Sequence, residues 1–171
     1  MVPDEHGEST ICNIYYDTAD YRLIRASLEK PAYKEKLRLR SYGVTEPGGE
    51  VFLELKKKYK GIVYKRRITL PEDAAGEFIA GRAPLGEHGQ IGREIEYFTA
   101  FYASLLPAVH LSYERSAWFS RKDRDLRITF DKNIRFRQED VSLILPAGGR
   151  RILPEGESLM EIKAAAALPL W

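Results

Sequence analysis

Positive side chains recur at every second residue in three stretches of this chain. They are Lys36, Arg38 and Arg40 in KEKLRLR, Lys56 and Lys58 in LELKKK, and Lys65 and Arg67 in YKRRITLP. Alternate residues of a β-strand project from one face about 6.6 Å apart, so each stretch predicts a strand with a cationic and an apolar face. Such faces either contact bulk solvent or surround an anion, because like charges at this spacing repel. The repetition of one sign favours the anion.

Three later stretches add to this pattern, and they also supply acids. They contain Arg115 in LSYERSAWF, Arg127 and Asp131 in LRITFD, and Glu161 and Lys163 in LMEIK. A basic surface with a few carboxylates suits phosphoryl transfer, in which Arg and Lys neutralise phosphate oxygens. One or two carboxylates and the substrate then hold a divalent ion. This chemistry needs no protein nucleophile.

Composition and missing motifs narrow the class of protein. The chain has 171 residues, 44% of them hydrophobic, a net charge of +2 and a single cysteine, Cys12. These values predict one globular domain in which positive charge matters only where it is concentrated. The sequence contains no HExxH, CxxC or GxGxxG motif. The amino end is acidic and no apolar run approaches the length of a membrane span, so we expect a soluble, cytoplasmic protein.

The elements that must position these residues are mostly strands. Expected strands cover residues 11–16, 34–43, 50–59, 62–70, 109–120, 125–137, 141–145 and 158–164, and expected helices cover 20–28, 71–80 and 91–105. The predicted fold class is α+β, an antiparallel sheet with a few flanking helices. If the sheet closes as a barrel with its charged faces inward, its charged lumen is a tunnel for phosphates.

An ordered series of motifs resembles the VTC domain, the catalytic domain of vacuolar transporter chaperone-type polyphosphate polymerases. The motifs are YYDTADYRLIRASL, KEKLRLRSYG, LELKKKYKGIVYKRRITLP, LSYERSAWFS, LRITFDKNIRF and LMEIKAAAALPLW. The resemblance covers residues 11–171 and places the chain among the CYTH-like triphosphate tunnel metalloenzymes. It implies an ATP-polyphosphate phosphotransferase that moves the γ-phosphoryl of ATP onto polyphosphate with Mn²⁺ or Mg²⁺.

The resemblance also implies a role for individual residues. The phosphate ligands would be Arg38, Arg40, Lys56, Lys65, Arg67, Arg115, Arg127 and Lys163, and among them Arg115, Arg127 and Lys56 would be catalytic. Glu161 resembles the metal-binding glutamate. Glu54 is either a second metal ligand or a partner that neutralises Lys56. Arg66 lies between Lys65 and Arg67 on the same expected strand, so we expect its side chain to project from the opposite face, away from the phosphates.

Two departures from the family pattern shape the remaining expectations. We expect a disordered or partly ordered segment over residues 1–10, and a tunnel domain over 11–171 that lacks the family's first basic strand and its C-terminal helix. The resulting open sheet edge predicts a dimer or a swapped oligomer. Two alternative functions stay open, a triphosphate tunnel hydrolase and a non-catalytic module that binds polyphosphate or inositol phosphates. We expect no nucleic-acid partner, because exposed stacking aromatics are not evident among the bases.

Overall fold

The protein, in a computed structural model that describes residues 1–123 and 125–164, is built on one antiparallel sheet. Its strands are β1 (Val2–Asp17), β2 (Tyr33–Tyr42), β3 (Glu50–Tyr59), β4 (Ile62–Pro71), β5 (Leu106–Phe119), β6 (Arg127–Arg137), β7 (Arg150–Arg151) and β8 (Ser158–Lys163). The helices are α1 (Arg22–Leu28), α2 (Glu72–Ile79) and α3 (Gly89–Tyr102). The strand order is β4-β3-β2-β1-β5-β6-β7, and β8 also pairs with β6. The predicted mixture of antiparallel sheet and a few helices is confirmed.

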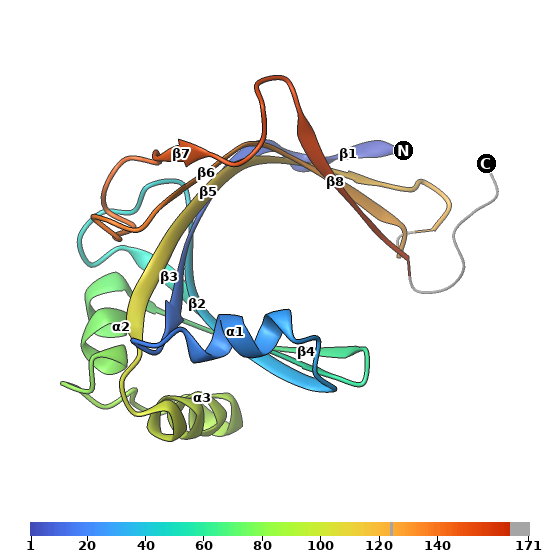
Figure 1. Ribbon diagram of the computed structural model, residues 1–171. Helices are drawn as coiled ribbons and strands as arrows, with labels where there is room; N and C mark the ends of the chain where they lie inside the picture. The colour runs from blue at the N-terminus through green and yellow to red at the C-terminus, as the bar shows by residue number, and fades with distance from the viewer. Residues whose placement is uncertain (124, 165–171) are drawn as a thin grey trace.

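The sheet is strongly curved but does not close (Figure 1). Breaks in register occur in the β1–β5 pairing on both sides of its long central run, and in the β5–β6 pairing between Ser112 and Glu114. Such bulges bend strands and increase their twist. Within the described residues, β8 pairs with β6 alone and no ladder joins β4 to β7 or β8. The closed barrel expected from the sequence is therefore replaced by an open, curved sheet, and the dimer through its edge stays a prediction.

The convex face of the sheet forms the main core. Alternating apolar residues of β2 and β3, such as Leu37, Leu39, Leu53 and Leu55, are almost completely buried there. Figure 1 shows α2 and α3 outside the curve, and Phe98 belongs to the same buried cluster as the strand residues. The apolar faces of these strands thus pack against helices, and their cationic faces form the concave side of the sheet. In the part of the chain described, every helix is too short or too polar to cross a membrane.

Asp17 fixes the position of α1 at one end of the concave face. Its carboxylate accepts hydrogen bonds from the amides of Leu23 at 2.8 Å and Ile24 at 3.0 Å. Thr18 Oγ1 accepts from the Arg22 amide at 2.9 Å, so both residues satisfy donors in the first turn. Asp17 and Thr18 therefore cap the first turn from before the helix, which begins at Arg22 and not at residue 20 as the sequence predicted.

Two segments differ from the sequence prediction. Strand β1 begins at Val2, and residues 2–3 and 8–10 of the segment expected to be disordered or partly ordered pair with β5. Residues 141–145 are not a strand, because the Arg137 guanidinium donates to the carbonyls of Asp140, Ser142 and Pro146 and holds this segment as a loop. The loop buries Leu143 in the core. Residues 165–171, the end of the expected domain, lie outside the described residues.

A buried histidine on β5 makes the stability of the fold dependent on pH. His110 is 0% exposed, and neither ring nitrogen has a hydrogen-bond partner among the described residues. Burial, together with the charge of Arg137, lowers the pKa of His110 to about 4. The unfolded chain binds this proton near pH 6.5, so the free energy of unfolding should fall, by up to about 3 kcal/mol, as the pH drops from 6.5 to 4.

Urea denaturation of the wild type and His110→Leu at several pH values measures this effect. The free energy of unfolding of the variant should fall less between pH 6.5 and 4 than that of the wild type, because leucine has no group that binds a proton. Parallel stability curves for the two proteins over this range would contradict the assignment to His110.

Candidate functional site

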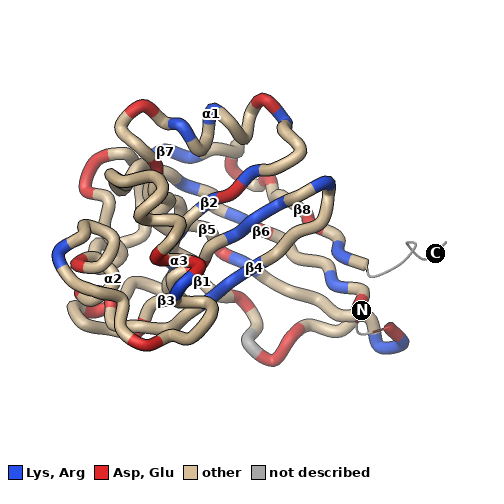
Figure 2. The backbone as a smooth tube through the Cα atoms, turned by 90° about the horizontal axis from the view of Figure 1, so that it is seen from below, with Lys and Arg blue, Asp and Glu red and all other residues tan. Residues whose placement is uncertain are grey.

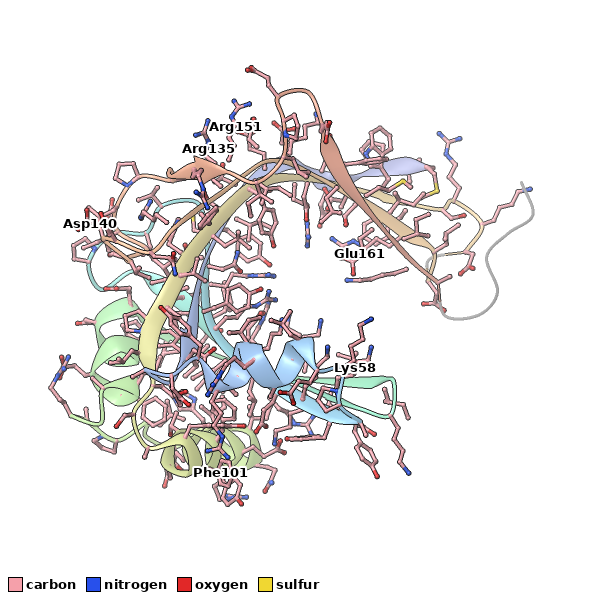
Figure 3. All side chains as sticks on the ribbon, viewed as in Figure 1. Lys58, Phe101, Arg135, Asp140, Arg151 and Glu161 are labelled. Carbon is pink, nitrogen blue, oxygen red and sulfur yellow. The ribbon has the colours of Figure 1, made fainter. Side chains whose placement is uncertain are left out.

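A groove of about 1610 Å³ follows the concave face of the sheet, and we call it the basic groove. Figure 3 shows side chains projecting into this concavity from both arms of the curve, and Figure 2 shows Lys and Arg recurring along the strands. The eight cations predicted as phosphate ligands all line it: Arg38, Arg40, Lys56, Lys65, Arg67, Arg115, Arg127 and Lys163. The structure therefore gathers residues from β2, β3, β4, β5, β6 and β8 into one site. Arg66 points away, as predicted, and pairs with Glu94 of α3 at 3.1 Å.

Glu54 lies beneath these cations and binds several of them at once. It is only 1% exposed. Its Oε2 accepts from Arg38 Nε at 2.6 Å, and its Oε1 accepts from Arg67 Nε at 2.7 Å and from Lys65 Nζ at 2.7 Å. The β2–β3–β4 register places Arg38, Glu54 and Arg67 directly opposite one another. Glu54 is thus the internal counterion of the groove, and its oxygens are already occupied by cations.

The same neighbours determine the protonation of Glu54. Burial alone would raise the pKa of this carboxyl, but Lys65, Arg38, Arg40 and Arg67 outweigh burial and lower it to about 2. The carboxylate is therefore charged throughout the physiological range. Of the two interpretations left open by the sequence, this geometry favours a neutralising role. Its partners are Arg38, Arg67 and Lys65, with Arg40 at 4.0 Å, and no ion pair joins it to Lys56 at 4 Å or less in the described chain.

The two arginines expected at the terminal phosphates differ in their surroundings. Arg115 makes a bidentate pair with Asp131, with Nε to Oδ1 at 2.6 Å and Nη2 to Oδ2 at 2.7 Å. This pair raises the pKa of Arg115. Arg127 lies over the Phe119 ring at 5.0 Å, and its buried Nε has no hydrogen-bond partner among the described residues. Arg127 consequently has donors available for an anion, whereas Arg115 is held in place by its own carboxylate.

Substitution of each arginine should separate these two situations. Arg127→Ala removes a charge-assisted contact and should weaken tripolyphosphate binding by about 1.5 to 3 kcal/mol while leaving stability nearly unchanged. Arg115→Ala should cost similar affinity, and it should also lower the free energy of unfolding by about 3 kcal/mol because Asp131 stays buried without a partner. Calorimetric titration and urea denaturation measure both quantities. Equal losses of stability in the two variants would contradict this distinction.

Three polar residues that bind the arginines of the groove were not among the predicted site residues. Asn13 Oδ1 accepts from Arg40 Nε at 2.9 Å, and the hydroxyls of Tyr113 and Tyr15 accept from Arg40 and Arg38 at 3.3 and 3.1 Å. Asn13 and Tyr15 alternate along β1, and Tyr113 alternates with Arg115 along β5, so the same period-two argument applies to all three. Their role is to orient the arginines, which a search for charge alone overlooks.

Glu161 is the carboxylate best placed for a metal ion. It points into the concavity from β8 (Figure 3), its side chain is about half exposed, and Lys163 Nζ lies 3.4 Å from it. Among the described residues no three His, Cys, Asp or Glu side chains converge on one point. A hard divalent cation such as Mg²⁺ is commonly bound through one or two carboxylates and substrate phosphates. The residues present fit a cation that Glu161 shares with a bound phosphate chain.

These features define a class of protein: a curved antiparallel sheet whose concave face is lined with Lys and Arg and whose rim carries the half-exposed carboxylate of Glu161. The sequence model of the VTC domain matches residues 2–171, so the chain belongs to the VTC domain family. The resemblance inferred from the motifs is confirmed.

Two individual proteins are similar to this chain, one in sequence and one in fold. The chain is 28% identical over 155 residues to the vacuolar transporter chaperone complex subunit 4 of Schizosaccharomyces pombe, covering 78% of this chain and 21% of that protein. It therefore spans about a fifth of the length of this relative. A crystal structure from Bacillus halodurans, described as a candidate adenylate cyclase, shares the fold with a TM-score of 0.51 and 18% identity, over 75% of this chain and 59% of that one.

Proposed function

We propose that this domain is an ATP-polyphosphate phosphotransferase that moves the γ-phosphoryl of ATP onto the end of a polyphosphate chain. The observation that supports this most directly is the meeting of eight predicted phosphate ligands, from six strands, in one groove. A phosphate chain offers acceptor oxygens in a row, and the groove offers rows of donors. Membership of the VTC domain family supports the same function.

The reaction requires little covalent chemistry from the protein. A terminal oxygen of polyphosphate attacks the γ-phosphorus of ATP, a new P–O bond forms, the bond from the γ-phosphorus to the β,γ-bridging oxygen breaks, and ADP leaves. Arg115, Arg127 and Lys56 would neutralise charge on the transferring group, and Arg38, Arg40, Lys65, Arg67 and Lys163 would align the chains. Bound Mn²⁺ or Mg²⁺ would add Lewis-acid neutralisation of phosphate charge beside Glu161.

Lys56 has an environment suited to this role. Burial, followed by the charge of Arg38, lowers the pKa of the Lys56 ammonium. No carboxylate of the described chain lies within 4.0 Å of its Nζ, so Lys56 forms no ion pair with the described residues. A phosphate oxygen would supply the missing counterion.

Hydrolysis of triphosphate is the second candidate function. Glu161 is about half exposed, so water can reach the rim of the groove beside the proposed metal ligand. A water molecule in place of the polyphosphate end would release free phosphate through the same in-line displacement.

Incubation of the protein with ATP and MnCl₂, with and without a tripolyphosphate primer, tests the proposal. Long phosphate chains together with ADP are the expected products. Free phosphate without chains would support the hydrolase. Binding of tripolyphosphate without turnover of ATP would overturn both enzyme functions and support a binding module for polyphosphate or inositol phosphates.

A further inference from the structure

A second cavity of about 520 Å³ lies beside the basic groove, next to α1, and we call it the α1 cavity. Most of its lining is aromatic or aliphatic, including Tyr15, Tyr21, Ile24, Val109 and Phe136. Ile24 and Tyr21 of the α1 segment are 42% and 47% exposed, although both belong to the lining. Apolar side chains thus line a concave surface that the rest of the described protein does not fill.

The α1 cavity and the basic groove share a wall. Tyr15 and Leu111 line both of them. The Tyr15 ring borders the apolar space, while its hydroxyl accepts a hydrogen bond from Arg38 Nη1 at 3.1 Å. A ligand that occupies both spaces therefore needs an apolar part joined to an anionic part.

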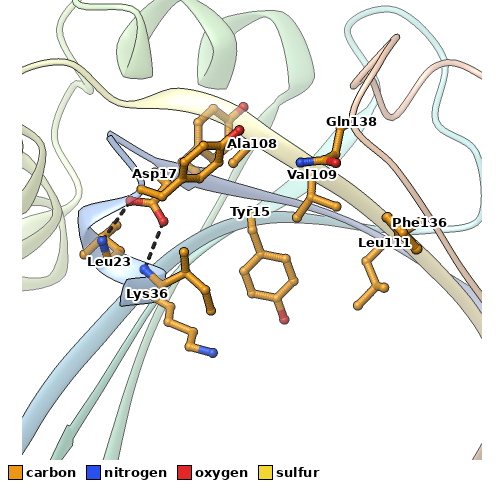
Figure 4. A pocket seen from close by; sticks show the side chains of 12 residues that line it. Tyr15, Asp17, Leu23, Lys36, Ala108, Val109, Leu111, Phe136 and Gln138 are labelled. Atoms are coloured by element: carbon orange, nitrogen blue, oxygen red, sulfur yellow. Dashed lines mark hydrogen bonds between the residues drawn. The ribbon is translucent and has the colours of Figure 1, made fainter. Parts of the chain in front are cut away.

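One charged group of the cavity, Lys36, is paired with a residue of the groove. Lys36 lines the cavity and stands directly opposite Lys56 in the β2–β3 pairing. Among the described residues neither ammonium has a carboxylate within 4.0 Å, so two like charges face each other across the ladder. Figure 4 shows Tyr15 between Lys36 and Leu111. An anion at this junction would relieve the repulsion.

Asp17 and Gln138 are the other non-aromatic polar residues of the cavity, and they differ in whether they can contact a ligand. Asp17 lines the cavity, but its carboxylate accepts from the amides of Thr18, Leu23 and Ile24. Gln138 is exposed, and its amide has no hydrogen bond within the described part of the protein. An amide offers a donor and an acceptor together, which suits the edge of a heterocyclic base.

We propose that the α1 cavity binds the aromatic base of the nucleoside triphosphate donor, an inference that rests on the proposed function. The base would lie among Tyr15, Tyr21 and Phe136, and the first phosphates would lie between Lys36 and Lys56. The cavity volume falls within the usual range of small-molecule sites, roughly 300–1,000 Å³. Aromatic side chains stack on any base, so the cavity favours nucleotides over inorganic phosphate chains without strong selection among bases.

Calorimetric titration of the full chain with ATP and with tripolyphosphate, in the absence of divalent metal, tests this site. Val109→Phe fills the cavity, and Tyr21→Asn removes a ring at a position with φ 58° that asparagine tolerates. Each variant should weaken ATP binding about tenfold, the size of one base–aromatic contact, and leave tripolyphosphate binding unchanged. Tyr97→Ala, which removes a 70% exposed ring of α3, is the matched control and should change neither affinity.

The outcomes separate this inference from the proposed function. Wild-type binding of both ligands, with no selective loss of ATP in either variant, would overturn the base site and leave the phosphate groove intact. Failure of the wild type to bind either ligand would overturn the proposed function as well. Thermal unfolding of each variant shows whether it is folded. If one of the two variants does not fold, the other still tests the base site.

Discussion

Glu54→Gln is expected to lower the free energy of unfolding by about 3 to 5 kcal/mol, the usual cost of removing one member of a buried charge cluster. Glu54 is 1% exposed and neutralises Arg38, Arg67 and Lys65 at 2.6 to 2.7 Å. The glutamine amide group carries no negative charge, and its NH₂ group would face the N–H donors of the three cations. The three cations would then repel one another. Urea denaturation at pH 7 measures the loss, and Glu46→Gln in the exposed turn between β2 and β3 is the matched control.

The pH dependence of this difference gives a second check. The pKa of Glu54 is lowered to about 2 in the folded protein, whereas the unfolded chain titrates near 4.5. The unfolded state therefore binds more protons between these values, and the stability due to Glu54 is present above pH 4.5 and is lost as the pH falls toward 2. The difference in the free energy of unfolding between wild type and Glu54→Gln should become smaller as the pH falls from 4.5 toward 2. A gap that stays constant from pH 5 to 2 would contradict the assignment.

Glu161→Gln is expected to reduce metal-dependent turnover of ATP by about a hundredfold or more, since the substitution removes the anionic side chain that we propose as the metal ligand. Binding of tripolyphosphate without metal should be retained. Glutamine also frees Lys163, which lies 3.4 Å from the Glu161 carboxylate in the wild type. Assays of product formation across MnCl₂ concentrations and calorimetric titration of tripolyphosphate measure the two effects separately.

Glu157→Gln is the control for this prediction, because Glu157 is an exposed carboxylate immediately before β8. It should leave turnover unchanged. If Glu161→Gln retained full turnover at every metal concentration, Glu161 would not be the metal ligand. If it lost tripolyphosphate binding as well, its role would be structural.

The sequence predicted which face of each long strand would be cationic, because side-chain alternation follows directly from backbone geometry. Arg38 and Arg40, together with Arg115 and Arg127, line the groove as this argument required. Helix α1 and its capping residue Asp17 were also predictable, since capping depends on local sequence. These successes concern interactions between residues close in the chain.

What the sequence left open depends on pairings between distant strands. Glu54 faces Arg38 and Arg67 only because of the registers of β2–β3 and β3–β4, which alternation does not specify. The bulges that break the β1–β5 and β5–β6 pairings determine the curvature, and curvature decides whether a sheet closes. The loop after β6 was mistaken for a strand because its apolar residues resemble one, while Arg137 binds its carbonyls from outside the segment.

The cations of the basic groove fall into two electrostatic kinds, and this has a consequence for salt sensitivity. Arg38, Arg40, Arg67, Lys65, Arg115 and Lys163 already have carboxylates of the protein within 4.0 Å as counterions, whereas Lys56 and Arg127 have none at that distance within the described residues. An arriving polyanion expels dissolved ions only from groups that hold them. The slope of binding affinity against salt concentration should therefore reflect only the second kind of cation. The groove should lose less affinity on addition of salt than its number of arginines and lysines implies.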